Sequence, residues 1–523
     1  MSKILFLIIF VVNLLLTAFL GWSVLQTHLL SPQLVIIAAA VLALIPMLLF
    51  ALQKEKKGQR KKTGFRAAAI VILLFLCLVE GAVCFYIQRY NSRISEITEV
   101  TTQYTQVEFY VKEEDRAQTI EYAMESRYRI GTLAGADTEA VDQVRGRLEK
   151  DYGRTLILQG YGTLLDLVRA LDEDQVDAIL ISSAYLDLMN TMPDYENFGS
   201  KLRVLYSGSV QTEIVFEPVA MDAEGKGDGE EGEDKAEETQ SMKDPDLWKE
   251  CFCAYISGID TYGKVTARSR SDVNILAIVN TETKMVLLLS TPRDYYIPFN
   301  FSPPNGALDK LTHAGIYGIE CSMRALGDYY QLPIHYYLRM NFTGFIGVID
   351  ALGGVDVESD ADFGRDGSYF HKGMNHLSGK DALNFVRNRH AFREGDRARG
   401  RHQMAVIKGV INGLMSSKLL TNYTELMDQM SECFQTNASM NMIGDLVQLT
   451  LDRSKGDWKV VTYSADGWGM SGYTFSQGAY AYVMVPYPET LEYARELVNA
   501  VISGEVLTQE QVQENAPVTL QGS

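Results

Sequence analysis

Three long apolar runs fill most of the first 87 residues, and they limit what this chain can fold into more than any other feature. The runs at 4–25, 34–52 and 67–87 contain 22, 19 and 21 residues, and a helix of such length crosses a hydrocarbon core of about 30 Å. We therefore predict a membrane region over residues 1–89 with three transmembrane helices. A cleaved signal peptide is the alternative for the first run, but two further runs and the lack of an Ala-x-Ala site argue against it.

A short basic segment between the second and third runs predicts the orientation of the membrane region. Six of the nine residues at 54–62 are Lys or Arg, and such loops stay on the cytoplasmic side. The third helix then runs outward, so the residues after about 89 are extracytoplasmic. Glu80 is the only charged residue in the third run. It is either a functional intramembrane carboxylate or, near the outer end of its helix, a side chain that points to the interface.

The acidic charge of the chain excludes one broad class of function. A formal net charge of −18 is unsuited to bulk nucleic-acid binding, which needs a basic face. Part of the acidity lies at 220–247, where 11 Asp or Glu residues and 3 Lys occur without apolar periodicity. This composition is typical of a disordered tether. We therefore predict an acidic disordered linker there, with a folded domain on either side.

The residues before the linker alternate between strand and helix patterns. Residues 129–133 and 176–181 are short apolar runs typical of buried strands, and 138–148 carries apolar residues at helical spacing. A small βαβ lobe over 105–219 accounts for this order. The lobe resembles part of an extracytoplasmic solute-binding domain, and a spacer domain without a ligand is the alternative.

The residues after the linker form a second outer domain in this interpretation. Apolar runs at 273–279 and 285–289 predict neighbouring buried strands, and apolar residues in 404–414 have helical spacing. We predict an α/β/α sandwich with a mixed sheet over 248–505, followed by a disordered tail at 506–523. The sequence does not choose among the three possible disulfide pairings of four cysteines in this domain, which are Cys251, Cys253, Cys321 and Cys433.

A cluster of arginines stands out in the second outer domain. Residues 387–401 contain six arginines although the chain as a whole is acidic, and the planar fork of Arg suits phosphate. Arg399 and Gln403 are four residues apart, so they share one face if this segment is a helix. The alternative is a solvated basic face or a patch for anionic lipid.

A second group of charged residues supports a phosphate site. Asp260 and Asp272 are 12 residues apart, and Arg270 comes just before the second. Arg293 follows a predicted buried strand. Two carboxylates near several arginines suit a hard divalent cation that bridges to phosphate oxygens. Either aspartate alone is more typical of a turn or a helix cap.

The order of these motifs resembles the LytR-CpsA-Psr (LCP) family. Seven motifs in one order are far more specific than a single motif. They span about half of the chain and lie at 258–260 (Gly-Ile-Asp), 270–272 (Arg-Ser-Asp), 290–294 (Ser-Thr-Pro-Arg-Asp), 348–356, 377–383, 386–389 (Val-Arg-Asn-Arg) and 395–403.

The resemblance implies an enzyme of cell-envelope assembly. Members of that family take a glycopolymer, such as teichoic acid or capsular polysaccharide, from a polyprenyl pyrophosphate carrier and join it to peptidoglycan by a phosphodiester. The resemblance also implies a Gram-positive cell membrane, membrane lipids as further partners, and Mg²⁺ or Mn²⁺ as the cofactor. Carried over by position, Asp260 and Asp272 hold the metal, and Arg293, Arg270 and Asp396 are catalytic. The diphosphate is bound by Arg270, Arg293, Arg387, Arg389, Arg399 and Gln403.

Two positions depart from the family pattern. Tyr262 stands where arginine is common, which puts one phosphate contact in doubt. His402 stands where arginine or asparagine is common, and we interpret it as a structural histidine. The general base also stays open between Asp294 and Asp396, because Asp294 is alternatively a salt-bridge partner that orients Arg293.

Two other functions are compatible with the same residues. A pyrophosphatase would hydrolyse the lipid diphosphate with water as the nucleophile and release free glycan. A non-enzymatic envelope sensor would bind a ligand in the 105–219 lobe and dock anionic wall polymer on the arginines. The transferase, which the resemblance implies, is our leading hypothesis. Its chemistry agrees with these residues, because phosphoryl transfer asks a protein mainly for positioning and charge neutralisation, which a metal and an arginine cluster supply.

Overall fold

The computed structural model describes most of the chain and divides it into two units. The described residues are 2–27, 32–52, 63–95, 98, 100, 102–135, 137–214, 250–259, 265, 268–301, 305–387, 396–414, 433–452, 454 and 456–517. The first unit comprises residues 1–99, 423–431 and 438–457, and the second comprises 100–422, 432–437 and 458–523. The linker predicted at 220–247 lies outside the described residues.

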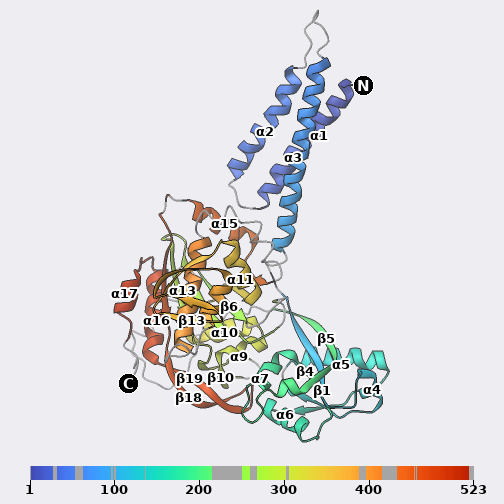
Figure 1. The fold of residues 1–523 in the computed structure, drawn as a ribbon, viewed down its shortest axis with the longest axis vertical. Helices are drawn as coiled ribbons and strands as arrows, with labels where there is room; N and C mark the ends of the chain where they lie inside the picture. Colours follow the sequence, from blue (N-terminus) through green and yellow to red (C-terminus); the bar gives the residue numbers. More distant parts are fainter. Residues whose placement is uncertain are drawn as a thin grey trace, which may run out of the picture. The chain divides into compact units, whose positions relative to one another are not determined.

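Three long apolar helices form most of the first unit (Figure 1). They are α1 (Ser2–Leu25), α2 (Pro32–Leu52) and α3 (Thr63–Ser95), and the shorter α15 (Met440–Leu451) belongs to the same unit. Each long helix contains a stretch that is long and apolar enough to cross a membrane, namely Ile4–Leu25, Pro32–Leu52 and Ala67–Arg89. These bounds agree with the predicted runs to within two residues. α1 packs against both α2 and α3.

Glu80 of α3 does not point to an interface, so that interpretation was wrong. Its side chain is buried, with 3 % of the residue exposed. The carboxylate accepts hydrogen bonds from Asn13 Nδ2 at 3.1 Å and from Thr17 Oγ1 at 2.7 Å, both on α1. A carboxylate among apolar helices is costly unless neighbouring side chains solvate it, and α1 presents two donors at the required height. Glu80 therefore joins α3 to α1.

We expect Glu80→Leu to weaken the packing of α1 against α3. The substitution removes the acceptor of both hydrogen bonds, and hydrogen bonds between membrane helices contribute roughly 0.6 to 2 kcal/mol each. The thermal unfolding midpoint of the detergent-solubilised chain should fall. Glu80→Gln is the matched control because its single amide oxygen can still accept one of these two hydrogen bonds. Equal midpoints for Glu80→Leu and Glu80→Gln would contradict the role of these hydrogen bonds.

The N-terminal part of the second unit is a small α/β lobe, residues 102–214, called the lobe below. Its strands are β1 (Thr102–Lys112), β2 (Ile130–Leu133), β3 (Leu158–Tyr161), β4 (Ala178–Ser182) and β5 (Leu202–Glu213). Its main helices are α4 (Ile120–Glu125), α5 (Thr138–Tyr152), α6 (Leu164–Asp172) and α7 (Leu186–Met189). The sheet order is β3-β2-β4-β1-β5, with β2 parallel to β3 and β4. The predicted βαβ pattern is confirmed, and antiparallel β1 and β5 extend it.

The rest of the second unit, residues 250–422, 432–437 and 458–517, is the C-terminal domain, which is built around a six-stranded sheet of order β16-β11-β6-β7-β8-β17. These strands are β6 (Cys251–Ile259), β7 (Val273–Asn280), β8 (Met285–Ser290), β11 (Tyr336–Asn341), β16 (Phe434–Thr436) and β17 (Lys459–Ser464). β6, β7 and β8 are antiparallel, whereas β11 is parallel to β6 and β17 is parallel to β8. The predicted mixed sheet is therefore confirmed.

Helices and short strands cover and connect this sheet. The helices are α9 (Leu311–Tyr317), α10 (Ile319–Tyr330), α11 (Phe342–Ala351), α12 (Gly379–Val386), α13 (Asp396–Leu414), α16 (Pro488–Ile502) and α17 (Gln509–Glu514). The short strands are β9 (Tyr296–Pro298), β10 (Leu308–Lys310), β12 (Val355–Ser359), β13 (Phe363–Arg365), β14 (Ser368–Phe370) and β15 (Gly373–Leu377). A longer hairpin joins β18 (Gly467–Thr474) to β19 (Ala479–Pro486).

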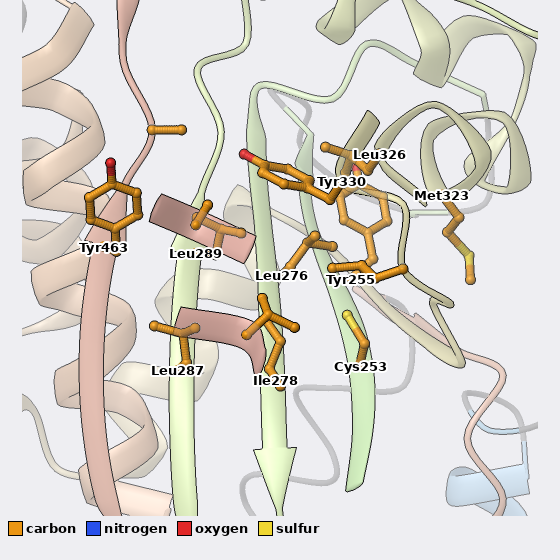
Figure 2. Close-up of a cluster of buried hydrophobic side chains, with 14 of the residues drawn as sticks. Cys253, Tyr255, Leu276, Ile278, Leu287, Leu289, Met323, Leu326, Tyr330 and Tyr463 are labelled. Carbon is orange, nitrogen blue, oxygen red and sulfur yellow. The ribbon is translucent and has the colours of Figure 1, made fainter. Parts of the chain in front are cut away.

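Alternate residues of the central strands face opposite layers of helices, which makes the sandwich. Figure 2 shows one face, where Leu276 and Ile278 of β7 and Leu287 and Leu289 of β8 lie with side chains of α10. The other face carries Ile275, Ala277, Val286 and Leu288, which pack with Met404 of α13. Both faces of the sheet are apolar because helices cover both of them. Polar side chains are therefore expected at the edge of the sheet where strands begin and end.

Gly318 with φ +139° separates α9 from α10. One prediction, at the C-terminal end, differs from the structure. The tail predicted to be disordered from 506 onward is wrong as far as 517, because α17 lies there. Gln509 of α17 exchanges hydrogen bonds with the backbone of Thr462 at 2.9 and 3.0 Å, and Val512 is buried. The six cysteines are free thiols.

Candidate functional site

One edge of the central sheet carries a cavity of about 300 Å³, near the lower end of the roughly 300–1,000 Å³ range of ligand pockets. β6 and β11 end there and β7 begins there, because Ile259 pairs with Asn341 and Gly258 with Val273. Most of the wall is apolar and consists of Ile256, Ile259, Val273, Met340, Phe342, Phe345, Leu383, Val386 and Ile407. This cavity, called the apolar cavity below, thus offers a long hydrocarbon surface.

Polar and charged side chains gather on the rest of the wall. Three of the predicted phosphate-binding residues, Arg387, Arg399 and Gln403, line the cavity. Arg399 and Gln403 reach it from one face of α13, as their spacing predicted, and Arg399 is 6 % exposed. Arg387 comes from the end of α12, and its guanidinium carbon lies 4.6 Å from the centre of the Phe342 ring. Such cation–π packing fixes the direction of the guanidinium.

A smaller cavity of about 150 Å³ lies along the same edge of the sheet, where β8 and β17 end. It shares Asp272, Arg399 and Gln403 with the apolar cavity. Its other residues are mostly polar and include Ser290, Thr291, Arg293, Arg401, Tyr463, Ser464, Asp466 and Thr490. This second space, called the polar cavity below, therefore meets the apolar cavity at three charged or amide side chains.

Asp272 and Arg293 form the ion pair at the centre of this arrangement. Arg293 Nη1 donates to Asp272 Oδ1 at 2.9 Å, and Thr312 Oγ1 donates to the same oxygen at 3.3 Å. Asp272 precedes β7 and Arg293 follows β8, so two neighbouring antiparallel strands bring them to one edge. Both side chains are less than one-fifth exposed. A partly dehydrated pair of this kind keeps its geometry better than an exposed one.

Asp294 interacts with cations on two sides. One carboxylate oxygen lies 3.6 Å from Arg293 Nε and the other lies 3.4 Å from Lys310 Nζ. The residue is buried, with 7 % exposed. A carboxylate between two cations attracts both of them and so helps to orient its partners. These contacts favour the orienting role of Asp294 over that of a general base.

Arg365 lines the apolar cavity but was not predicted from the sequence. It ends β13, in a hairpin whose Asp366 and Gly367 both have positive φ. Its Nη1 donates to the backbone carbonyl of Arg387. An Asp-Gly pair between short strands predicts the hairpin, yet nothing local in the sequence indicates that the hairpin lies beside α12.

The remaining predicted site residues have different positions. Arg270 does not line either of these two cavities; its guanidinium lies 3.7 Å from Asp187 of the lobe. Asp260 and Arg389 lie outside the described residues, as does Tyr262. Asp396 begins α13, and the described part of the structure does not include its side chain. The roles of these four predicted residues stay predictions.

His402 is enclosed by aromatic rings rather than by the cavities. Its imidazole stacks on Phe363 with ring centres 4.9 Å apart and lies 4.5 Å from the centre of Phe385. Burial lowers the pKa of His402 below its ordinary value, and the nearby Asp360 carboxylate opposes this only in part. The residue therefore packs as a neutral ring at neutral pH, which agrees with the structural interpretation.

Comparison with known proteins gives one consistent result. A model of the LytR_cpsA_psr family matches residues 219–486. A polyisoprenyl-teichoic acid–peptidoglycan teichoic acid transferase TagU from Enterococcus faecalis is 32 % identical over 254 residues, which cover 48 % of this chain and 80 % of that protein. A protein of the same name from Bacillus cereus is 30 % identical over 244 residues, covering 46 % and 74 %.

Solved structures also match about half of the chain. The crystal structure of B. subtilis TagV has a TM-score of 0.41 and 25 % identity, and covers 50 % of this chain and 99 % of that one. A structure of TagT bound to LI-WTA has a TM-score of 0.40 and 25 % identity, covering 50 % and 94 %.

Proposed function

Because this chain belongs to the LytR-CpsA-Psr family, we propose that it is a membrane-anchored transferase of glycopolymers. The donor is a glycan on a polyprenyl pyrophosphate, the acceptor is peptidoglycan, and the product is a phosphodiester. Relatives at 30 and 32 % identity are named as transferases of teichoic acid from a polyisoprenyl carrier to peptidoglycan. We propose a polymer of this class, teichoic acid or capsular polysaccharide.

One observation carries this proposal. The apolar cavity combines an apolar wall with several guanidinium groups. The donor has an isoprenoid chain and a diphosphate, so a site for it needs hydrocarbon surface next to fixed positive charge. Nine apolar residues supply the surface, and Arg387, Arg399 and Arg365 supply the charge. Arginine binds phosphate oxygens through two parallel hydrogen bonds and stays protonated when partly buried.

The residues along the sheet edge suit displacement at the phosphorus atom that carries the glycan. A hydroxyl oxygen of the acceptor forms a new bond to this phosphorus, the bond to the bridging oxygen breaks, and polyprenyl phosphate leaves. Negative charge grows on the phosphate oxygens and the leaving group, and Arg293, Arg387 and Arg399 neutralise it. The Asp272 carboxylate keeps Arg293 in place. We propose Asp396 as the group that takes the proton of the acceptor hydroxyl.

A divalent metal ion fits this donor set. Asp272 offers hard carboxylate oxygens at the junction of the two cavities, and magnesium typically takes one or two protein carboxylates. No group of three or more metal-ligating side chains occurs among the described residues. We propose that Asp260 and Asp272 hold Mg²⁺ or Mn²⁺, which supplies positive charge to the diphosphate.

The three apolar helices suit a donor whose polyprenyl chain is embedded in the bilayer. Three helices are long and apolar enough to cross a membrane. The basic segment at 54–62 joins the second and third helices, and its positive charge favours a cytoplasmic position for this loop. We propose a multi-pass protein of a Gram-positive cell membrane whose lobe and C-terminal domain face outward. The apolar cavity, the lipid-linked donor and the cell wall are then all on the outer side of the membrane.

A reconstitution assay tests the proposed function. The full chain in lipid nanodiscs is incubated with Mg²⁺, a short glycan on polyprenyl pyrophosphate, and peptidoglycan oligomers, and the products are separated by mass. We expect a coupled phosphodiester that disappears with EDTA and in Arg293→Ala. Free glycan phosphate without coupling would favour the pyrophosphatase, and an intact donor with every glycan tried would favour the non-enzymatic sensor.

A further inference from the structure

The lobe and the C-terminal domain meet at residues 268–272, called the bridging segment below. Arg268 opens it, and the Arg268 backbone N–H donates to the Tyr104 carbonyl of β1 at 3.3 Å. The Arg268 guanidinium donates to Asp137, which precedes α5, at 2.5 Å. Only 14 % of the Arg268 side chain and 6 % of the Asp137 side chain are exposed. This buried ion pair ties the segment to the lobe.

The Arg268–Asp137 pair belongs to a larger buried group of charges. Glu320 of α10 accepts two hydrogen bonds from Gln103 of the lobe, at 2.9 and 3.1 Å. Burial raises the pKa of Glu320, and nearby Arg268 and Arg339 oppose this rise. Arg339 of β11 is itself buried, which lowers its pKa to about 10 and still leaves it charged at neutral pH. Two guanidiniums thus balance two carboxylates, a condition for burying charge at modest cost.

The C-terminal domain holds the bridging segment from the other side. The Ser271 backbone N–H donates to the Thr312 carbonyl of α9 at 3.2 Å. A Cβ atom on Gly315 would lie 2.4 Å from the Ser269 carbonyl oxygen, so α9 touches the segment directly. Ile316, in the next position of α9, is buried in the apolar cluster of the lobe. The bridging segment therefore lies between the lobe and the C-terminal domain, which contact each other through Ile316, and does not run along a free surface.

Three charged residues of the bridging segment, Arg268, Arg270 and Asp272, are spaced two positions apart. Arg268 contacts Asp137 and Arg270 lies 3.7 Å from Asp187, both of the lobe. Asp272, two residues further on, contacts Arg293 and lines both cavities. Because the lobe holds Arg268 and Arg270, it restrains the short backbone stretch that leads to Asp272.

We propose that the lobe is a built-in part of the transfer site, in which Asp137 and Asp187 hold Arg268 and Arg270 and thereby act as positioning residues for Asp272. They act through the bridging segment and do not touch the substrate. This inference rests on the proposed transferase function. It differs from both earlier interpretations of the lobe, the ligand-binding module and the passive spacer, because it gives the lobe a role in turnover without a ligand of its own.

Asp187→Asn is the first variant that tests this inference. About half of the Asp187 side chain is exposed, so the substitution removes one charge with little effect on folding. We expect the transfer rate at saturating donor to fall roughly 2- to 5-fold, the size of a partly screened charge contact. The thermal unfolding midpoint should stay unchanged, and Asp187→Glu should restore most of the rate. A purely structural contact would not give this rescue at constant stability.

Thr191→Val is the matched control at the same boundary. Thr191 Oγ1 accepts a hydrogen bond from Gln477 Nε2 of the C-terminal domain at 3.2 Å, but it does not contact the bridging segment. Its transfer rate should equal that of the native chain. A loss in Thr191→Val as large as that in Asp187→Asn would overturn the inference, because any weakening of the boundary would then have the same effect.

Amide hydrogen exchange separates this inference from the proposed function. In Asp137→Asn the peptide that contains 268–272 should exchange faster than in the native chain, whereas Thr191→Val should leave it unchanged, whether or not the assay detects transfer. Native exchange in Asp137→Asn together with native turnover in Asp187→Asn would overturn the positioning role. A native chain that couples no glycan, but whose exchange changes in this way, would contradict the transferase and retain the role of the lobe in ordering the segment.

Discussion

Arg399→Ala should abolish nearly all transfer activity. Arg399 lines both cavities and is 6 % exposed, so it lies where the two cavities meet, at the proposed position of the diphosphate. Loss of one preorganised group of this kind lowers turnover by roughly 100- to 1,000-fold. Rates of phosphodiester formation at saturating donor and acceptor measure the effect. Arg399→Lys should recover only part of the rate, because an ammonium lacks the planar fork.

The control for this prediction is a second arginine of similar chemistry far from the cavities. Arg145 of α5 is more than one-third exposed and pairs with Asp142 at 3.0 Å, so Arg145→Ala should transfer at the native rate. Thermal midpoints of both variants check that the chain still folds, since a buried arginine also contributes packing through its methylenes. Turnover in Arg399→Ala within a few-fold of native would remove Arg399 from the site.

Asp272→Asn should have an effect at least as large, and it distinguishes two roles of this carboxylate. Asp272 accepts hydrogen bonds from Arg293 and Thr312, and it is also one of two proposed metal ligands. An asparagine keeps an acceptor oxygen for Arg293 but loses the charge. We expect turnover to fall roughly 1,000-fold, the upper range for a preorganised electrostatic group, and the Mg²⁺ concentration for half-maximal rate to rise.

Asp294→Asn is the matched comparison for Asp272→Asn. Asp294 also lies beside Arg293, at 3.6 Å, but is held by Lys310, and it is not a proposed metal ligand. Its substitution should lower the rate through Arg293 without changing the Mg²⁺ requirement. If Asp272→Asn likewise left the Mg²⁺ requirement unchanged, Asp272 would serve only to orient Arg293, and the proposed metal site would lose its one described ligand.

Features that depend on neighbours along the chain followed from the sequence. The spacing of apolar residues predicted the membrane helices to within two residues and the buried hairpin of β7 and β8. Ser378, in the motif at 377–383, caps α12, because its hydroxyl accepts from the Asp381 N–H three residues further on. The shared face of Arg399 and Gln403 follows from 3.6 residues per turn. Each of these properties spans a few residues, so local geometry determines it.

Contacts between distant segments could not be predicted in the same way. The sequence marked Arg270 and Arg293 alike as phosphate ligands, but the folded chain turns Arg270 toward the lobe and Arg293 toward Asp272. Arg365 has no motif around it, and only the position of the β13–β14 hairpin brings it to the apolar cavity. The segment at 509–514 has one buried apolar residue, and its order depends on a partner 47 positions away.

The same division holds for the molecule as a whole. Apolar length and periodicity, which act over one helix or strand, were enough to determine a membrane region and an α/β/α sandwich with a mixed sheet. Only the tertiary structure decided that Glu80 is solvated by α1, that two cavities meet at Asp272, Arg399 and Gln403, and that the lobe holds the bridging segment. These outcomes depend on side chains of opposite charge or polarity meeting across long sequence separations, where burial makes each unpaired group costly.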